Sequence, residues 1–179
     1  MGEGAVGVVG GGGGARSPCG SAARGVRGAP RWTKYAVRGD PGQGMREAER
    51  TLEDPRLITC RGGGPFLPQD AFAEHRLSRA WLAQKLAEPH DGPTLVVTHH
   101  VPHPAARNPV FGATSLSPAF DSNCGDLIDA AARAKVVAWV FGHHHWSLEV
   151  DVGGVRLVSA QFGYPGENTA WNGPGRLRI

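Results

Sequence analysis

The chain has 179 residues, of which 40% are hydrophobic and 20% charged, so it is long enough for one globular domain with a substantial core. A run of about 18 apolar residues is absent, which excludes a membrane-spanning helix, and the start of the chain has no signal-peptide pattern. Cys19, Cys60 and Cys124 are widely spaced and do not form a disulfide framework. We therefore expect a cytoplasmic protein with no membrane partner.

Residues 1–27 differ in composition from the rest of the chain. Gly, Ala, Arg and Ser dominate them, and five consecutive glycines run from Gly10 to Gly14. Such a segment buries too little apolar surface to offset its chain entropy, which predicts disorder. Gly10, Gly12 and Ala15 also fit a dinucleotide-binding fingerprint, but no helical pattern follows them, and low complexity is the favoured interpretation. We divide the chain into this segment and a folded domain over 28–179.

The net charge of +3 is concentrated near the N-terminus. Between Glu3 and Asp40 the chain has six basic residues and no acidic one. A basic tail of this kind can associate with nucleic acid, but aromatic residues are not interleaved with its basic residues. Nucleic-acid binding is therefore the least favoured hypothesis.

Helical and strand patterns alternate along the rest of the chain. Apolar spacing predicts helices over 45–52, 68–88 and 126–134, with Ala73, Leu77, Ala80 and Trp81 on the buried face of the second. The predicted strands are a short one at 57–59, two buried ones at 94–98 and 136–141, and a hairpin of 150–152 with 155–158. The turn of that hairpin is Gly153-Gly154. The expected fold class is α/β, a mixed β-sheet with flanking helices.

Both predicted buried strands end in histidines. Thr98-His99-His100-Val101-Pro102 follows the first, and Phe141-Gly142-His143-His144-His145 follows the second. In extended chain His143 and His145 point to one side and His144 to the other. Ligands bind beyond the carboxyl ends of strands in open α/β sheets, and neutral imidazole is the commonest nitrogen ligand for zinc, manganese or iron. A metal site is favoured over the alternative of surface or satisfied core histidines.

Five segments, in this order, resemble bacterial calcineurin-like phosphoesterases over Gly28 to Asn168. They are 32–37, 75–82, 97–102, 140–145 and 163–168, and the Gly-His-x-His element at 142–145 is the most specific. The resemblance implies the C-terminal half of a four-layer α/β/β/α sandwich and a binuclear site of Mn, Fe or Zn ions, which hydrolyses a phosphoester. It implies that His99 and His143 bind one metal and His145 the other, with His100 and His144 as neighbours and not ligands.

The carboxylate half of that family's site does not occur in this sequence. The family also carries Asp-x-His, Gly-Asp and Gly-Asn-His motifs, and Gly39-Asp40 comes too late in the chain to be the second, so Asp40 is interpreted as a loop residue. Without bridging carboxylates the metal charge is poorly compensated, and weak or absent activity is expected. A truncated gene start is one hypothesis for the missing half. A partial sheet also predicts self-association through an exposed strand edge.

The hypothesis from the sequence is thus a metal-dependent phosphoester hydrolase with an unknown substrate and unassigned catalytic residues. The alternative is a non-catalytic fragment whose histidines bind at most one transition metal. Glu167 and Asn168, which end the last matching segment, are interpreted as solvated loop residues.

Overall fold

A computed structural model of the protein describes residues 17–21, 24–29, 33–60, 62–169, 171–173 and 177. Within these residues the chain forms a six-stranded sheet in the order β1-β2-β3-β4-β6-β5. The strands are β1 Ser17–Ser21, β2 Arg24–Ala29, β3 Thr94–Thr98, β4 Val136–Val140, β5 Leu148–Val152 and β6 Val155–Ser159. Neighbours among β2, β3, β4 and β6 are parallel, while the edge strands β1 and β5 run antiparallel to theirs. The predicted α/β class with a mixed sheet is confirmed.

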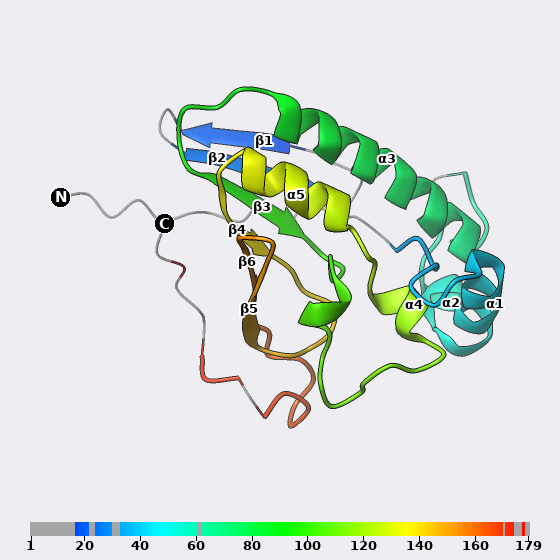
Figure 1. Ribbon diagram of the computed structural model, residues 1–179. Coiled ribbons are helices and arrows are strands. Elements are labelled where there is room, and N and C mark those ends of the chain that lie inside the picture. Colours follow the sequence, from blue (N-terminus) through cyan, green and yellow to red (C-terminus); the bar gives the residue numbers. More distant parts are fainter. Residues whose placement is uncertain are drawn as a thin grey trace.

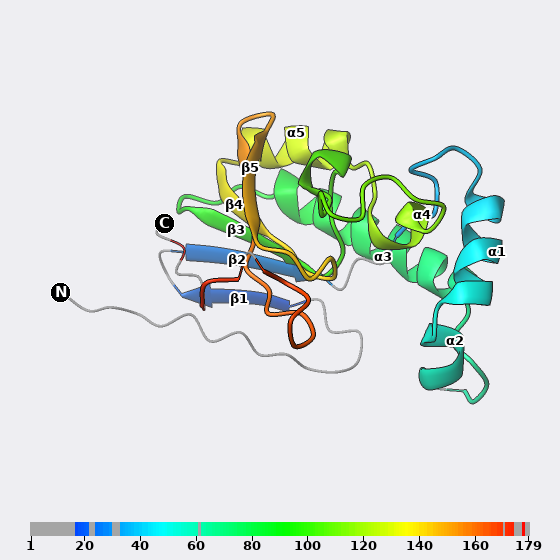
Figure 2. The same ribbon diagram turned by 90° about the horizontal axis from the view of Figure 1, so that it is seen from below.

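Two helices, one of them the longest in the described chain, cover one face of this sheet. The helices are α1 Pro41–Thr51, α2 Asp54–Leu57, α3 Pro68–Ala87, α4 Ser117–Phe120 and α5 Gly125–Arg133, with a 3₁₀ turn, η1, over Pro104–Ala106. Helices α3 and α5 lie side by side over the strands, and α1, α2 and α4 gather near the start of α3 (Figures 1 and 2). None of the described helices is both long and apolar enough to cross a membrane.

Local signals explain where the first helices begin. Asp40 caps α1, because its carboxylate accepts the backbone N–H groups of Gly42 and Gln43 at 2.9 and 3.1 Å. Asp40 is therefore a helix cap and not simply a loop residue. Leu57, expected in a strand, is instead the last residue of α2. The proline of Asp54-Pro55 suits the first turn of a helix, which favours this short helix over the strand.

The N-terminal strands are a departure from the sequence analysis. Disorder was expected throughout 1–27, but β1 and the first four residues of β2 lie in that range, so the prediction was wrong there. The pairing of β2 with β3, in which Val26 lies opposite Leu95, explains the difference, because backbone hydrogen bonds between strands do not depend on side-chain composition. Residues 1–16, with the dinucleotide fingerprint and the five-glycine run, lie outside the described residues.

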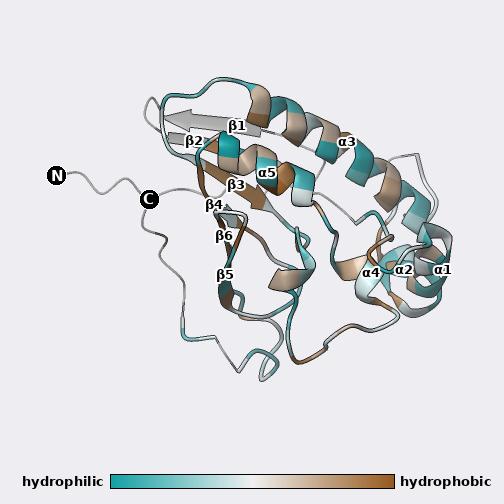
Figure 3. Cartoon of the chain, viewed as in Figure 1, coloured by the Kyte–Doolittle hydropathy of each residue, from teal (hydrophilic) through white to brown (hydrophobic). Residues whose placement is uncertain are grey.

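The core lies between the sheet and helices α3 and α5. Trp139, Leu82, Leu157 and Ile128 are almost completely buried there, and Figure 3 shows hydrophobic residues along β3 and on α5 where these elements face each other. The Nε1–H of Trp139 donates to Thr98 Oγ1 at 2.9 Å. This bond joins β4 to the last residue of β3 and so fixes the point from which the histidine segments leave the sheet.

Candidate functional site

The two histidine segments meet at the carboxyl ends of β3 and β4. The backbone N–H of Gly142 donates to the carbonyl oxygen of His99 at 2.8 Å, which continues the pairing of the two strands by one bond. The Nε2 atom of His99 lies 3.2 Å from the Nδ1 atom of His143, and the ring centroids are 4.9 Å apart. Two residues that are 44 positions apart in sequence are thus brought together, at the edge of the sheet where α/β proteins bind ligands.

The backbone at the second segment is strained. His143 and His145 have φ angles of +75° and +47°, a left-handed conformation that side chains other than glycine rarely adopt. The expectation that both residues sit in extended chain was therefore wrong. Each such conformation costs roughly 1–3 kcal/mol, and it persists only where the surroundings impose it. Strain of this kind at two site histidines is typical of a functional segment.

His143 is held between other rings and is uncharged. Phe120 stacks on it with a centroid distance of 4.8 Å and an interplanar angle of 29°, and the His100 ring lies at 4.2 Å. Burial, followed by the neighbouring histidines His99, His144 and His145, lowers the pKa of His143 to about 3. At neutral pH the ring is therefore in the form that can donate a lone pair to a metal ion.

The pKa of His99 is also below its usual value. Desolvation of the ring is the largest cause and the charge of His145 the next, while the carboxylate of Asp54 in α2 opposes both. Asp54 is the acidic residue whose charge acts on this histidine, and the sequence analysis did not identify it. Burial raises the pKa of Asp54 itself. The carboxylate therefore lies in a partly desolvated position, near enough to the histidines to influence them.

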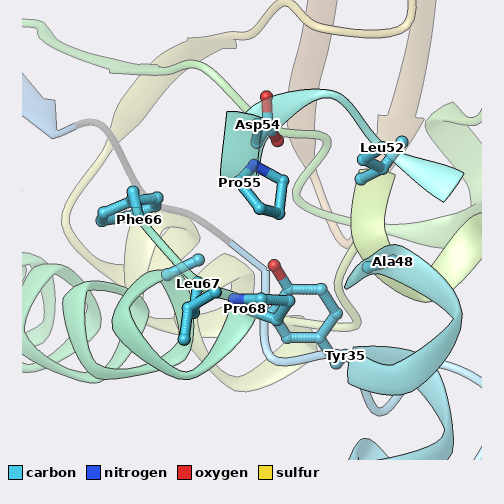
Figure 4. A pocket seen from close by; sticks show the side chains of 9 residues that line it. Tyr35, Ala48, Leu52, Asp54, Pro55, Phe66, Leu67 and Pro68 are labelled. Carbon is cyan, nitrogen blue, oxygen red and sulfur yellow. The ribbon is translucent and has the colours of Figure 1, made fainter. Parts of the chain in front are cut away.

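A small pocket is lined in part by Asp54. Tyr35, Pro55, Phe66 and Pro68 are among its lining residues, and Figure 4 shows the Tyr35 ring below the Asp54–Pro55 turn. Burial and the charge of Asp54 raise the pKa of Tyr35 to about 12, so its hydroxyl stays protonated. The cavity volume of ≈ 10 Å³ is about that of a single water molecule, too small for a substrate.

The spacing of the His99 and His143 nitrogens matches that of two ligands on one ion. Two nitrogens at 2.0–2.1 Å from a tetrahedral ion lie about 3.3 Å apart, close to the 3.2 Å between these atoms. Within the described residues, however, no group of three or more His, Cys, Asp or Glu side chains is placed to hold a metal ion. The pair thus fits two positions of a coordination sphere, and water or substrate oxygens would have to fill the others.

His145 faces a different partner. Its Nδ1 atom is 2.8 Å from Glu167 Oε2, and the same oxygen accepts the backbone N–H of Tyr164 at 2.8 Å. Gln161 Oε1 accepts the backbone N–H of His145 at 3.1 Å. Asn168, with 9% of its surface exposed, donates to the Gln161 carbonyl and to Ser147 Oγ. The interpretation of Glu167 and Asn168 as solvated loop residues was wrong, because both join the segment after β6 to the histidine segment.

His144 points into the protein. Its Nδ1 atom accepts the backbone N–H of Asn108 at 2.8 Å, and the Asn108 side-chain amide donates to the His144 carbonyl at 3.1 Å. Only 8% of His144 is exposed, and burial, then the charge of Arg107, lowers its pKa to about 4. The Nδ1 atom of His144 is therefore engaged within the fold and ties the histidine segment to the loop that carries Asn108.

A buried ion pair lies near His144, since the charge of Arg107 acts on that ring. The guanidinium of Arg107 donates through Nε to Asp121 Oδ2 at 2.7 Å, and Nη2 lies 2.5 Å from the same oxygen. Asp121 is completely buried and directly follows Phe120, whose ring covers His143. Neither member of the pair stood out in the sequence, since single charged residues in loops carry no pattern.

Comparisons with known proteins give a fold but no family. No family model matches the chain, and no curated protein matches it. A solved structure of the phosphopantetheinyl hydrolase PptH from Mycobacterium tuberculosis is similar, with a TM-score of 0.51 and 19% sequence identity over 84% of this chain. The matched region is 59% of that protein, so the chain spans less than two thirds of its neighbour. At this identity the similarity establishes a shared fold alone.

The family assignment made from the sequence was wrong. It rested on short motifs resembling calcineurin-like phosphoesterases, but no model of that or any other family matches, and the structural neighbour belongs to a distinct family. The motifs misled because polar residues gather at strand ends in many α/β proteins, whatever their ancestry. The roles of His99, His143 and His145 therefore depend on their own geometry.

Proposed function

We propose that this protein is a hydrolase of phosphoesters that uses a divalent metal ion held by His99 and His143. The observation that carries the proposal is the 3.2 Å separation of two neutral imidazole nitrogens at the carboxyl ends of adjacent parallel strands. The fold shared with a phosphopantetheinyl hydrolase supports a hydrolase acting on a phosphate-containing group as the substrate class.

The residues near this pair divide into three roles. A divalent ion bound by the pair would supply positive charge for a phosphoryl oxygen and lower the pKa of a bound water. His145, with its Nδ1 directed at Glu167, has Nε2 left to bind a second ion or to exchange a proton with the substrate. Phe120 and His100 hold the His143 ring in place by contact on its faces.

The second candidate is a protein that binds one metal ion without catalysis. It is favoured by the lack, in the described residues, of a group of three or more metal-binding side chains. An ion with only two protein ligands would bind weakly, and a phosphoester would have no carboxylate-bridged metal pair to act on. Both candidates require metal binding, and only the first requires turnover.

One experiment separates the candidates. Hydrolysis of a chromogenic phosphodiester is measured with added Mn²⁺ for the parent chain, His143→Ala and His90→Ala, beside direct measurement of Mn²⁺ binding. His90 is a matched control because it is exposed and precedes β3, at the opposite end from His99. Turnover that is lost in His143→Ala and kept in His90→Ala supports the hydrolase. Binding without turnover favours the second candidate, and no Mn²⁺ binding by the parent chain rejects both.

A further inference from the structure

The contact between His145 and Glu167 determines which nitrogen of the imidazole is available. The pKa of Glu167 is lowered, chiefly because its carboxylate accepts the Tyr164 N–H, so the group is ionised at neutral pH. An ionised carboxylate can only accept hydrogen bonds. The 2.8 Å contact with Nδ1 therefore requires a proton on Nδ1, and in the neutral ring this leaves the lone pair on Nε2.

The carboxylate is itself held in position by a tight turn. Glu167 Oε2 accepts the Tyr164 N–H at 2.8 Å, and the Glu167 N–H donates to the Tyr164 carbonyl at 3.0 Å. Gly163 has a φ of +72°, and a Cβ at that position would lie 3.0 Å from His145 Cβ and 3.1 Å from Glu167 Oε2. The turn is therefore packed directly against the histidine and its carboxylate partner.

The backbone of His145 is held in position as well as its ring. His145 has a φ of +47°, and its backbone N–H donates to Gln161 Oε1 at 3.1 Å. Gln161 in turn donates to the Trp146 carbonyl at 3.3 Å, so the segment after β6 holds His145 by its main chain as well as by its ring. Hydrogen bonds at both ends fix the ring orientation, which a metal ligand or a proton acceptor requires.

We propose that Glu167 is a positioning residue that holds His145 in its Nδ1–H tautomer and directs Nε2 toward the proposed phosphoester site. This inference deepens the proposed function and rests on it for the use made of Nε2, although the tautomer can be measured without any metal or substrate. Carboxylates that bind the far nitrogen of a histidine are a common support for metal ligands, and removing them typically costs 10–100-fold in metal affinity or activity.

The test uses the full chain and three variants: Glu167→Ala, Glu167→Gln and the control Glu149→Gln. Glu149 is matched because it also forms a 2.8 Å contact with one basic side chain, Arg156, but on the β5–β6 hairpin. Long-range ¹H–¹⁵N NMR spectra of the imidazoles at pH 8, without metal, report which nitrogen of His145 carries the proton. Isothermal titration with Mn²⁺ follows on the same samples.

We expect the Nδ1–H tautomer in the parent, in Glu149→Gln and in Glu167→Gln, because the Gln carbonyl oxygen can still accept both N–H groups. Glu167→Ala should shift His145 toward Nε2–H and lower Mn²⁺ affinity or Mn²⁺-dependent turnover about 10–100-fold, with Glu167→Gln in between. The proposal is overturned, even if Mn²⁺ binds, by an Nε2–H tautomer of His145 in the parent. It is also overturned if His145 in Glu167→Ala keeps the same tautomer as in the parent. A tautomer shift without any Mn²⁺ binding by the parent instead rejects the proposed function and leaves Glu167 as an orienting residue.

Discussion

His99 Nε2 and His143 Nδ1 lie 3.2 Å apart, and the rings belong to segments that leave two neighbouring parallel strands. If both nitrogens bind the same ion, removing either ligand should weaken metal binding nearly as much as removing both. We expect His99→Ala and His143→Ala each to weaken Mn²⁺ or Co²⁺ binding at least tenfold, about 1.4 kcal/mol, and the double variant to be little worse than either.

Isothermal titration of the parent, the two single variants and the double variant checks this double-mutant cycle. Additive losses would mean that the two histidines do not share an ion. His90→Ala serves again as the control, since an exposed histidine far from the pair should leave the binding constant unchanged.

His144 makes the stability of the fold depend on pH. Its pKa is lowered from 6.5 to about 4, so the unfolded chain takes up a proton before the folded chain does. The stabilisation is complete above pH 6.5 and is lost as the pH falls toward 4. Between pH 7 and pH 5.5 we expect His144 to account for a loss of about 1 kcal/mol in the free energy of unfolding.

His144→Asn isolates this contribution. The Asn side-chain oxygen can occupy the position of Nδ1 and accept the Asn108 N–H, but it does not titrate. Urea unfolding at pH 7 and pH 5.5 should give a smaller change for the variant than for the parent, and the other histidines with lowered pKa values, His143 among them, supply the remaining change. An equal change in both proteins would show that His144 is not the group responsible.

The elements that could be predicted from the sequence are those whose buried residues form a regular apolar pattern. The apolar runs of β3 and β4 are continuous because both faces are covered, and the prediction of two buried strands followed directly. The meeting of His99 and His143 was also predictable, since adjacent parallel strands deliver their C-terminal residues to the same edge.

Where polar residues occupy a buried face, apolar spacing predicted the wrong residues. Ala73, Leu77, Ala80 and Trp81 were expected to face the core, yet Leu77 is 54% exposed. The buried face of α3 instead carries Ala71, His75, Ser78, Leu82 and Leu86. His75 and Ser78 break the apolar pattern, so a search for apolar spacing selected the wrong side of the helix.

The partners of the histidines were beyond the reach of sequence patterns. Glu167 contacts His145 from 22 positions away, and Asn108 contacts His144 from 36, in loops whose paths depend on the finished fold. The positive φ angles of His143 and His145 also arise from the surroundings, because neither residue favours that conformation by itself. A sequence could identify the histidines, but not their orientation.

The buried pair of Arg107 and Asp121 should be much more sensitive to single than to double substitution. Asp121 is completely buried, and its Oδ1 atom has no hydrogen-bond partner in the described part of the chain. Asp121→Ala leaves the Arg107 charge uncompensated, which should cost roughly 3–5 kcal/mol. Arg107→Met combined with Asp121→Leu should recover a large part of that loss.

Urea unfolding of the three proteins gives the comparison, with Glu149→Ala as the control. Its partner Arg156 is 43% exposed at the side chain, and an exposed pair of this kind contributes at most about 1 kcal/mol. If the double variant were as unstable as Asp121→Ala, packing and not charge would be the source of the loss.

Substitutions at Gly163 and Gly166 distinguish the effect of backbone strain from the effect of contact with His145. Both are left-handed, with φ angles of +72° and +81°, but a Cβ at Gly166 would meet nothing within 4 Å. At Gly163 a Cβ would lie 3.0 Å from His145 Cβ. Gly166→Ala should cost roughly 1–2 kcal/mol from conformation alone, and Gly163→Ala should cost more, because His145 must also shift.

The same two variants also report on the site. Displacement of His145 should change its NMR signals and weaken Mn²⁺ binding in Gly163→Ala, whereas Gly166→Ala should lose stability with its Mn²⁺ affinity intact. Equal effects of the two substitutions on stability and on Mn²⁺ binding would mean that the turn after β6 does not hold His145. In that case the packing of Gly163 would not be what positions the contact between Glu167 and His145.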